Sequence, residues 1–117
     1  MSLEFFSATD TGRARNNNED SIAVHEAAGL VVLADGMGGY NAGEVASEMT
    51  TSAIVAGVAQ YWLPDCAPDH AGALALLEEQ IRLANYAVYD RAQTEEGCEG
   101  MGTTVVAALV NGDRVAM

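Results

Sequence analysis

The sequence of 117 residues contains no lysine, and its five cationic residues are all arginines. They are outnumbered by 17 acidic residues, which gives a formal net charge of −12. A groove that tracks a nucleic-acid backbone needs clustered cations, and the same groups attract a protein to an anionic membrane surface. The charge balance therefore argues against nucleic acid and against membranes as partners.

Cysteines and long apolar runs are also scarce. Cys66 and Cys98 are the two cysteines, and they lack the paired spacing of a metal or redox motif. A reducing, cytoplasmic location is the expectation that follows. No apolar run reaches transmembrane length, and the N-terminus lacks the regions of a signal peptide. Half of the residues are nevertheless apolar, which is enough for the core of one domain.

The order of apolar runs and turn signals predicts strands, then two long helices, then strands. This order favours an α+β fold, with helices packed on a largely antiparallel sheet. The expected elements are β-prone residues at 3–9, strands at 21–25, 29–34 and 103–110, helices at 42–61 and from 69 to about 96, and a hairpin turn at 111–112 leading into a strand at 113–117.

Capping residues mark the ends of both predicted helices. Asn41, with Glu44 three residues later, resembles a capping box. Asp69 is suited to cap the second helix, and Gly97 to follow its end. The residues expected to be buried are Val45, Met49, Ala53, Ala56 and Ala59 on the first helix and Leu74, Leu77, Ile81, Ala84 and Val88 on the second.

One candidate functional segment combines an arginine with two adjacent carboxylates. Arg15 precedes Glu19 and Asp20 by four and five residues, with three asparagines between them. Adjacent side chains of a strand point to opposite faces, so the two carboxylates converge on one centre only where the backbone bends. Asparagine-rich segments bend readily. A solvated turn with a local ion pair is the simpler alternative.

A second candidate segment follows the apolar strand: Asp35 is succeeded by Gly36, Met37 and two further glycines. Glycine lets a backbone group approach a ligand closely. The dinucleotide motif G-x-G-x-x-G fails at Asn41, and the phosphate-binding P-loop fails because Glu44-Val45 stands in place of Lys-Ser/Thr. A plain strand-to-helix connection is the alternative reading.

Hard divalent cations account for both segments together, because Mg²⁺ and Mn²⁺ prefer carboxylate, carbonyl and water oxygens. Asp35 is suited to bridge two ions, and the carbonyl of Gly36 adds a ligand. Glu19 or Asp20 binds directly or through water. Arg15 then remains as a planar fork for a phosphate. Two metal ions roughly 3.5–4 Å apart are the established arrangement for hydrolysing phosphate esters.

Three blocks of the sequence carry a resemblance to a known family. They are Arg-x-x-Asn-Glu-Asp at 15–20, Asp-Gly-Met-Gly-Gly leading into Ala-Gly-Glu-Val-Ala-Ser at 35–47, and Gly-Met-Gly-Thr-Thr at 100–104. In this order they resemble the metal-dependent Ser/Thr protein phosphatases of the PP2C (PPM) type. The resemblance implies an α-β-β-α sandwich, in which antiparallel sheets are flanked by two long antiparallel helices. Residues 1–117 are expected to form its N-terminal portion, incomplete at the C-terminus.

The resemblance also implies a role for each matching residue. Asp35 would bridge two Mn²⁺ or Mg²⁺ ions, and Gly36 would bind through its backbone oxygen. Glu19 would ligate one ion, directly or through water, and Asp20 would position metal-bound water. Arg15 would hold the substrate phosphate. The implied reaction is attack by a hydroxide that bridges the two ions on phosphoserine or phosphothreonine of a protein, with a kinase and its substrates as partners.

Two departures from the family pattern shape the expectation. Met37 stands where many animal members of the family have histidine. Methionine at this position is usual in the bacterial branch. The later aspartates of the family are absent, and Asp113 lacks the neighbouring serine and falls one strand too early. The chain alone is therefore expected to be inactive or nearly so, with unpaired strands that favour a dimer. A non-catalytic phosphoprotein-binding or regulatory module, or a plain acidic metal binder, is the alternative.

Overall fold

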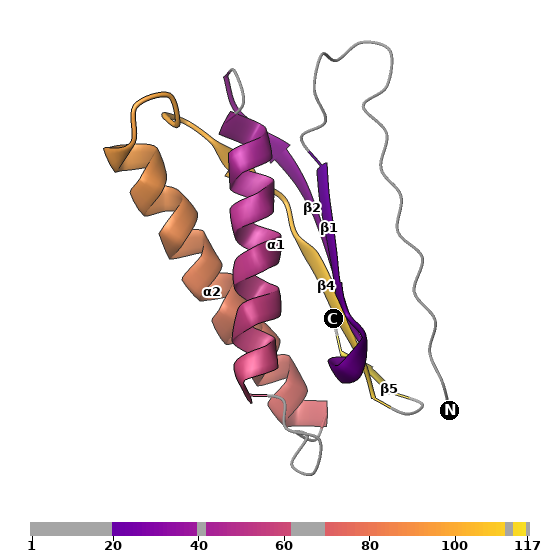
Figure 1. Ribbon diagram of the computed structural model, residues 1–117. Coiled ribbons are helices and arrows are strands. Elements are labelled where there is room, and N and C mark those ends of the chain that lie inside the picture. Colours follow the sequence, from indigo (N-terminus) through magenta and orange to yellow (C-terminus); the bar gives the residue numbers. More distant parts are fainter. Residues whose placement is uncertain (1–19, 40–41, 62–69, 112–113, 117) are drawn as a thin grey trace.

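Two long helices lie side by side on one face of an antiparallel sheet (Figure 1). The computed structural model describes residues 20–39, 42–61, 70–111 and 114–116. The elements are β1 (Asp20–His25), a 3₁₀ turn (Glu26–Ala28), β2 (Leu30–Met37), α1 (Ala42–Tyr61), α2 (His70–Thr94), β3 (Gly102–Thr103), β4 (Val106–Asn111) and β5 (Arg114–Ala116). The strand order is β1-β2-β4-β5, and β3 pairs with β2. This arrangement confirms the predicted α+β class.

The predicted elements are found with few changes. The first helix has the predicted bounds, and the strand expected to end at residue 34 continues to Met37. The strand expected at 103–110 is interrupted at 104–105. Gly97 lies in the turn beyond Thr94, with a left-handed φ of 91°, and not directly after the helix. The predictions for 3–9, Asn41, Asp69 and the turn residue Gly112 lie outside the described residues.

The sheet has one buried face and one open face. Leu30, Val32 and Ala34 of β2 point toward the helices and are buried, and Leu30 and Val32 share the core with Ile54 and Val58 of α1. Alternate side chains of a strand point to opposite faces. The large apolar side chains that are most exposed on the open face are Leu33 at 45%, Met37 at 56% and Val106 at 57%. The described residues therefore cover the sheet on the helix side.

The predicted buried stripe of α1 was wrong. Ala53 and Ala56 are exposed, and Val45, Met49 and Ala59 are only partly buried. The residues that are buried instead are Ala42, Gly43, Ala46, Ser47, Thr50, Thr51, Ile54 and Val58. The hydroxyls of Ser47 and Thr51 donate to carbonyls three residues earlier in the helix, at 3.1 and 3.3 Å. These bonds let polar side chains be buried, so small and hydroxyl-bearing residues form the face that packs on the sheet.

The prediction for α2 agrees better with the structure. Leu77, Ala84 and Val88 are buried and Ile81 is partly buried, whereas Leu74 is exposed. Within the described residues, neither helix is long and apolar enough to cross a bilayer.

Candidate metal centre

Asp20 and Asp35 are direct cross-strand partners in the pairing of β1 with β2. Cross-strand partners point to the same face of a sheet. Asp35 alternates with the buried Ala34, so both carboxylates belong to the open face, and the Asp35 side chain is exposed there. The structure thus brings together two of the predicted site residues. Arg15 and Glu19 lie outside the described residues.

The backbone hydrogen bonds of Asp35 show which kind of cross-strand pair this is. Its carbonyl accepts from the N–H of Thr104 at 2.9 Å, and its own N–H donates to Thr104 Oγ1 at 3.2 Å. Both backbone groups therefore point away from β1. Asp20 and Asp35 form a non-hydrogen-bonded pair, in which Cα atoms are about 4.5 Å apart and side chains are closest. Carboxylates at such positions repel each other, and a cation between them reverses the local field.

Gly36 brings a third oxygen to the same region. The N–H and C=O of successive strand residues point to opposite edges. The N–H and C=O of Asp35 point toward Thr104, so the carbonyl of the next residue, Gly36, points to the opposite edge, where β1 lies. β1 begins at Asp20, and the Gly36 carbonyl is directed just beyond that end of β1. Two carboxylates and a carbonyl are the donors that Mg²⁺ and Mn²⁺ prefer, so the residues present fit such a site.

The carboxylate pair does not by itself complete a metal site. In the part of the chain that the structure describes, no three or more side chains of His, Cys, Asp or Glu are gathered as metal ligands. Asp20 and Asp35 are two of the donors that a site needs. Glu19, the further carboxylate predicted from the sequence, is the neighbour of Asp20 in the undescribed segment.

The segment at residues 35–39, expected to follow the strand at 29–34, is part of that strand at its first three positions. Asp35, Gly36 and Met37 belong to β2, because β3 supplies a pairing partner for the strand end: Gly36 pairs with Thr103 and Met37 with Gly102. The turn into α1 is left to Gly38 and its neighbours. Gly38 has a φ of 155°, and a Cβ there would lie 2.8 Å from Ala42 Cβ. Close packing of α1 on the strand end thus requires glycine at this position.

The arginines Arg82 and Arg91 lie on α2, on the helix side of the sheet. Arg82 pairs with Glu79 of the same helix, and Arg91 pairs with Glu95 just beyond its end. A hydrogen bond from Arg91 holds the pKa of the Glu95 carboxyl below its ordinary value, and one with Glu79 raises the pKa of Arg82. Exposed pairs of this kind add little to stability. Neither arginine is placed to hold a phosphate at Asp35, and the role of Arg15 stays a prediction.

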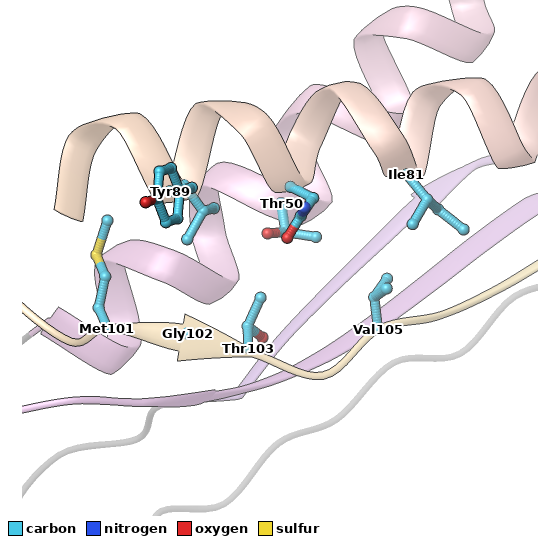
Figure 2. Close-up of a pocket in the computed structure, with 9 residues that line it drawn as sticks. Thr50, Ile81, Tyr89, Met101, Gly102, Thr103 and Val105 are labelled. Carbon is cyan, nitrogen blue, oxygen red and sulfur yellow. The ribbon is translucent and has the colours of Figure 1, made fainter. Parts of the chain in front are cut away.

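A cavity of about 290 Å³ lies between the helices and β3, on the helix side of the sheet (Figure 2). Its lining includes Thr50 of α1, Ile81 and Tyr89 of α2, Thr103 of β3, and Met101 just before that strand. No carboxylate or histidine is among the lining residues. This cavity therefore offers no ligand set for a hard cation, and it is separate from the open face that carries Asp35. No sequence pattern indicated it.

These features define an α+β domain in which an antiparallel sheet carries helices on one face and the paired aspartates Asp20 and Asp35 on the other. A family profile described as Protein phosphatase 2C matches residues 11–117. The chain belongs to the protein phosphatase 2C family, which confirms the resemblance seen in the three sequence blocks.

Similar proteins come from bacteria. The serine/threonine protein phosphatase PstP of Mycobacterium tuberculosis is 41% identical over 115 residues, which are 98% of this chain and 21% of that protein. The serine/threonine phosphatase stp of Listeria welshimeri is 34% identical over 131 aligned residues, covering all of this chain and 46% of that protein. The chain therefore spans about a fifth to about half of the length of these relatives.

Solved structures show the same fold. A bacterial serine phosphatase superposes with a TM-score of 0.78 at 36% identity, over 92% of this chain and 43% of that one. The catalytic domain of PstP in complex with two manganese ions gives 0.69 at 42% identity, over 91% and 42%. The PstP complex confirms the predicted Mn²⁺ or Mg²⁺ cofactor for the family. The chain matches part of the sandwich fold of these enzymes.

Proposed function

We propose that residues 1–117 form the N-terminal portion of a metal-dependent protein Ser/Thr phosphatase domain and supply part of its binuclear Mn²⁺ or Mg²⁺ centre. The pairing of Asp20 with Asp35 on the open face carries this proposal, because it places two carboxylates at the closest cross-strand spacing. The two manganese ions of the related PstP domain support it.

Each site residue has a role in this proposal. Asp35 would hold the ions through its carboxylate, and Gly36 would contribute its backbone oxygen. Glu19 and Asp20 complete the acidic side of the site, and Arg15 binds the phosphate of a phosphoserine or phosphothreonine protein. When bound, the ions would supply positive charge for the phosphate oxygens and a nucleophile derived from water at neutral pH. A chain with a net charge of −12 needs this local reversal of charge to hold a phosphate dianion.

The exposed apolar side chains on the open face support the view that the chain is one part of a larger domain. Leu33, Met37 and Val106 lie on the same face as Asp35. In an α-β-β-α sandwich this face packs against a second sheet, which also places the carboxylates at the end of the space between the sheets. A stable monomeric binding module of 117 residues would be expected to bury these side chains.

We expect the chain of 117 residues to hydrolyse an aryl phosphate or a phosphothreonine peptide at close to the background rate in millimolar Mn²⁺. The reason is that the later metal-binding aspartates of the family are absent from this sequence, so at least one ion lacks ligands. Phosphate release with and without Mn²⁺ measures this, with the PstP catalytic domain as the positive control. Mn²⁺-dependent turnover that disappears in Asp35→Asn would show that these residues suffice for catalysis and contradict the expected inactivity.

We also expect the isolated chain to self-associate through the open face. Leu33→Ser removes an apolar contact from that face and should shift the population toward monomer in size-exclusion chromatography with light scattering. Leu83→Ser is the matched control, because Leu83 is 48% exposed on α2, close to the 45% of Leu33. A monomeric unaltered chain, or an equal shift in both variants, would contradict association through this face.

A further inference from the structure

The strand that pairs with Asp35 is interrupted directly opposite it. β3 and β4 pair with β2 in one continuous register, with Gly36 opposite Thr103 and Leu33 opposite Val106. Thr104 therefore stands opposite Asp35. Two residues at a hydrogen-bonded position of an antiparallel ladder normally exchange two backbone bonds. Here the N–H of Thr104 donates to the Asp35 carbonyl at 2.9 Å, but the N–H of Asp35 has a different acceptor.

Two threonine hydroxyls replace the missing part of the ladder. The N–H of Asp35 donates to Thr104 Oγ1 at 3.2 Å, and the same hydroxyl lies 3.4 Å from the Asp35 carbonyl oxygen, to which it donates. The carbonyl of Thr104, which is the ordinary acceptor at this position, accepts from Thr103 Oγ1 at 2.8 Å instead. One hydroxyl thus contacts both backbone groups of Asp35, and the other holds Thr104 in this conformation.

These contacts matter because Thr104 is the hydrogen-bond partner of both backbone groups of Asp35 among the described residues. Its side chain is exposed, and its position in a non-hydrogen-bonded pair gives its backbone no bond to β1. The direction of the Asp35 carboxylate therefore depends on the backbone that Thr104 holds. Groups that orient a metal ligand affect binding strongly, and losing one typically costs about 10–100-fold in metal affinity.

We propose that Thr104 is a positioning residue that orients Asp35 for cation binding, with Thr103 holding Thr104 in place. The proposal rests on the proposed function, since Asp35 is a metal ligand only within it. It assigns a role to the Thr-Thr pair of the Gly-Met-Gly-Thr-Thr block, whose residues are not among the predicted ligands. The hydroxyl at position 104 is the required group, so serine is expected to replace threonine and valine is not.

The test compares Thr104→Val with Thr104→Ser in the chain of 117 residues. Calorimetric titration with Mn²⁺ should show about a tenfold or greater loss of affinity in Thr104→Val and an affinity near that of the unaltered chain in Thr104→Ser. Amide hydrogen exchange of Asp35, measured by NMR without metal, should be faster in Thr104→Val and restored in Thr104→Ser. Thr94→Val is the control, because its hydroxyl bonds to the Asp90 carbonyl at 2.9 Å on α2, away from the site.

The outcomes separate this proposal from the proposed function. Mn²⁺ binding by the unaltered chain with an unchanged affinity in Thr104→Val would overturn the positioning role alone. Absence of Mn²⁺ binding by the unaltered chain would overturn the proposed function and this proposal with it. Thr103→Val decides the matter if Thr104→Val does not fold, because it leaves the Thr104 hydroxyl in place. A smaller loss of affinity in Thr103→Val supports the proposal, and no loss contradicts it.

Discussion

Asp35→Asn is expected to abolish measurable Mn²⁺ binding by the chain while leaving it folded. Asparagine keeps the size of the side chain but removes the charge and one of the donor oxygens. The loss of metal affinity should exceed the roughly 10–100-fold that follows removal of a group that hydrogen-bonds to a metal ligand and orients it. Folding should be unimpaired, because the Asp35 side chain is exposed. The substitution also removes the charge repulsion between Asp35 and its cross-strand partner Asp20.

Two measurements check the effect of Asp35→Asn: calorimetric titration with Mn²⁺, and the rise in the thermal midpoint that Mn²⁺ causes by binding the folded state. Asp90→Asn on α2 is the matched control, because it makes the same change in net charge at another exposed aspartate. Asp20→Asn is expected to weaken binding as well. Equal losses in Asp35→Asn and Asp90→Asn would indicate attraction by net charge alone and contradict a site at Asp35.

The partner of Asp35 depends on a register that the sequence pattern leaves open. Strands were predicted at 21–25 and 29–34, but the pairing of Asp20 with Asp35 depends on the geometry of the connection between them. The 3₁₀ turn ends at Gly29, which has a left-handed φ of 69° and donates its N–H to the Glu26 carbonyl at 3.0 Å. A shift of one residue in register would move Asp20 to the helix face. Asp35 and Asp20 were therefore predictable as candidate site residues, but their pairing across the two strands was not.

Patterns of apolar residues predicted the existence of both helices better than their buried faces. Apart from Gln80, the buried positions described in α2 are apolar, and Leu77, Ala84 and Val88 were identified correctly. In α1 the buried face includes Ser47 and Thr51, whose hydroxyls bond within the helix. An apolar stripe is then a poor guide, because polar groups that are satisfied locally can be buried. The contacts of Thr104 were not predictable from such a pattern either, because its hydrogen bonds to Asp35 depend on how β3 and β4 pair with β2.

Gly38→Ala is expected to destabilise the chain by roughly 3 kcal/mol, because it combines overpacking with a backbone conformation that L residues rarely adopt. The new Cβ would lie 2.8 Å from Ala42 Cβ and 3.1 Å from the backbone N of Gly43. Ala42 and Gly43 are both buried in the first turn of α1. Relief of the overlap therefore requires the helix to move away from the end of β2.

Urea unfolding of Gly38→Ala and Gly39→Ala measures this effect, with unchanged slopes required for the comparison. A Cβ on Gly39 meets no atom within 4 Å, so Gly39→Ala should change stability by less than about 1 kcal/mol. Adding Ala42→Gly to Gly38→Ala removes the nearest clashing atom and should recover part of the loss. Equal losses at Gly38 and Gly39 would contradict a close approach of α1 to Gly38. A specific loss at Gly38 would show that this glycine serves helix packing, whereas Asp35, Gly36 and Asp20 belong to the proposed cation site.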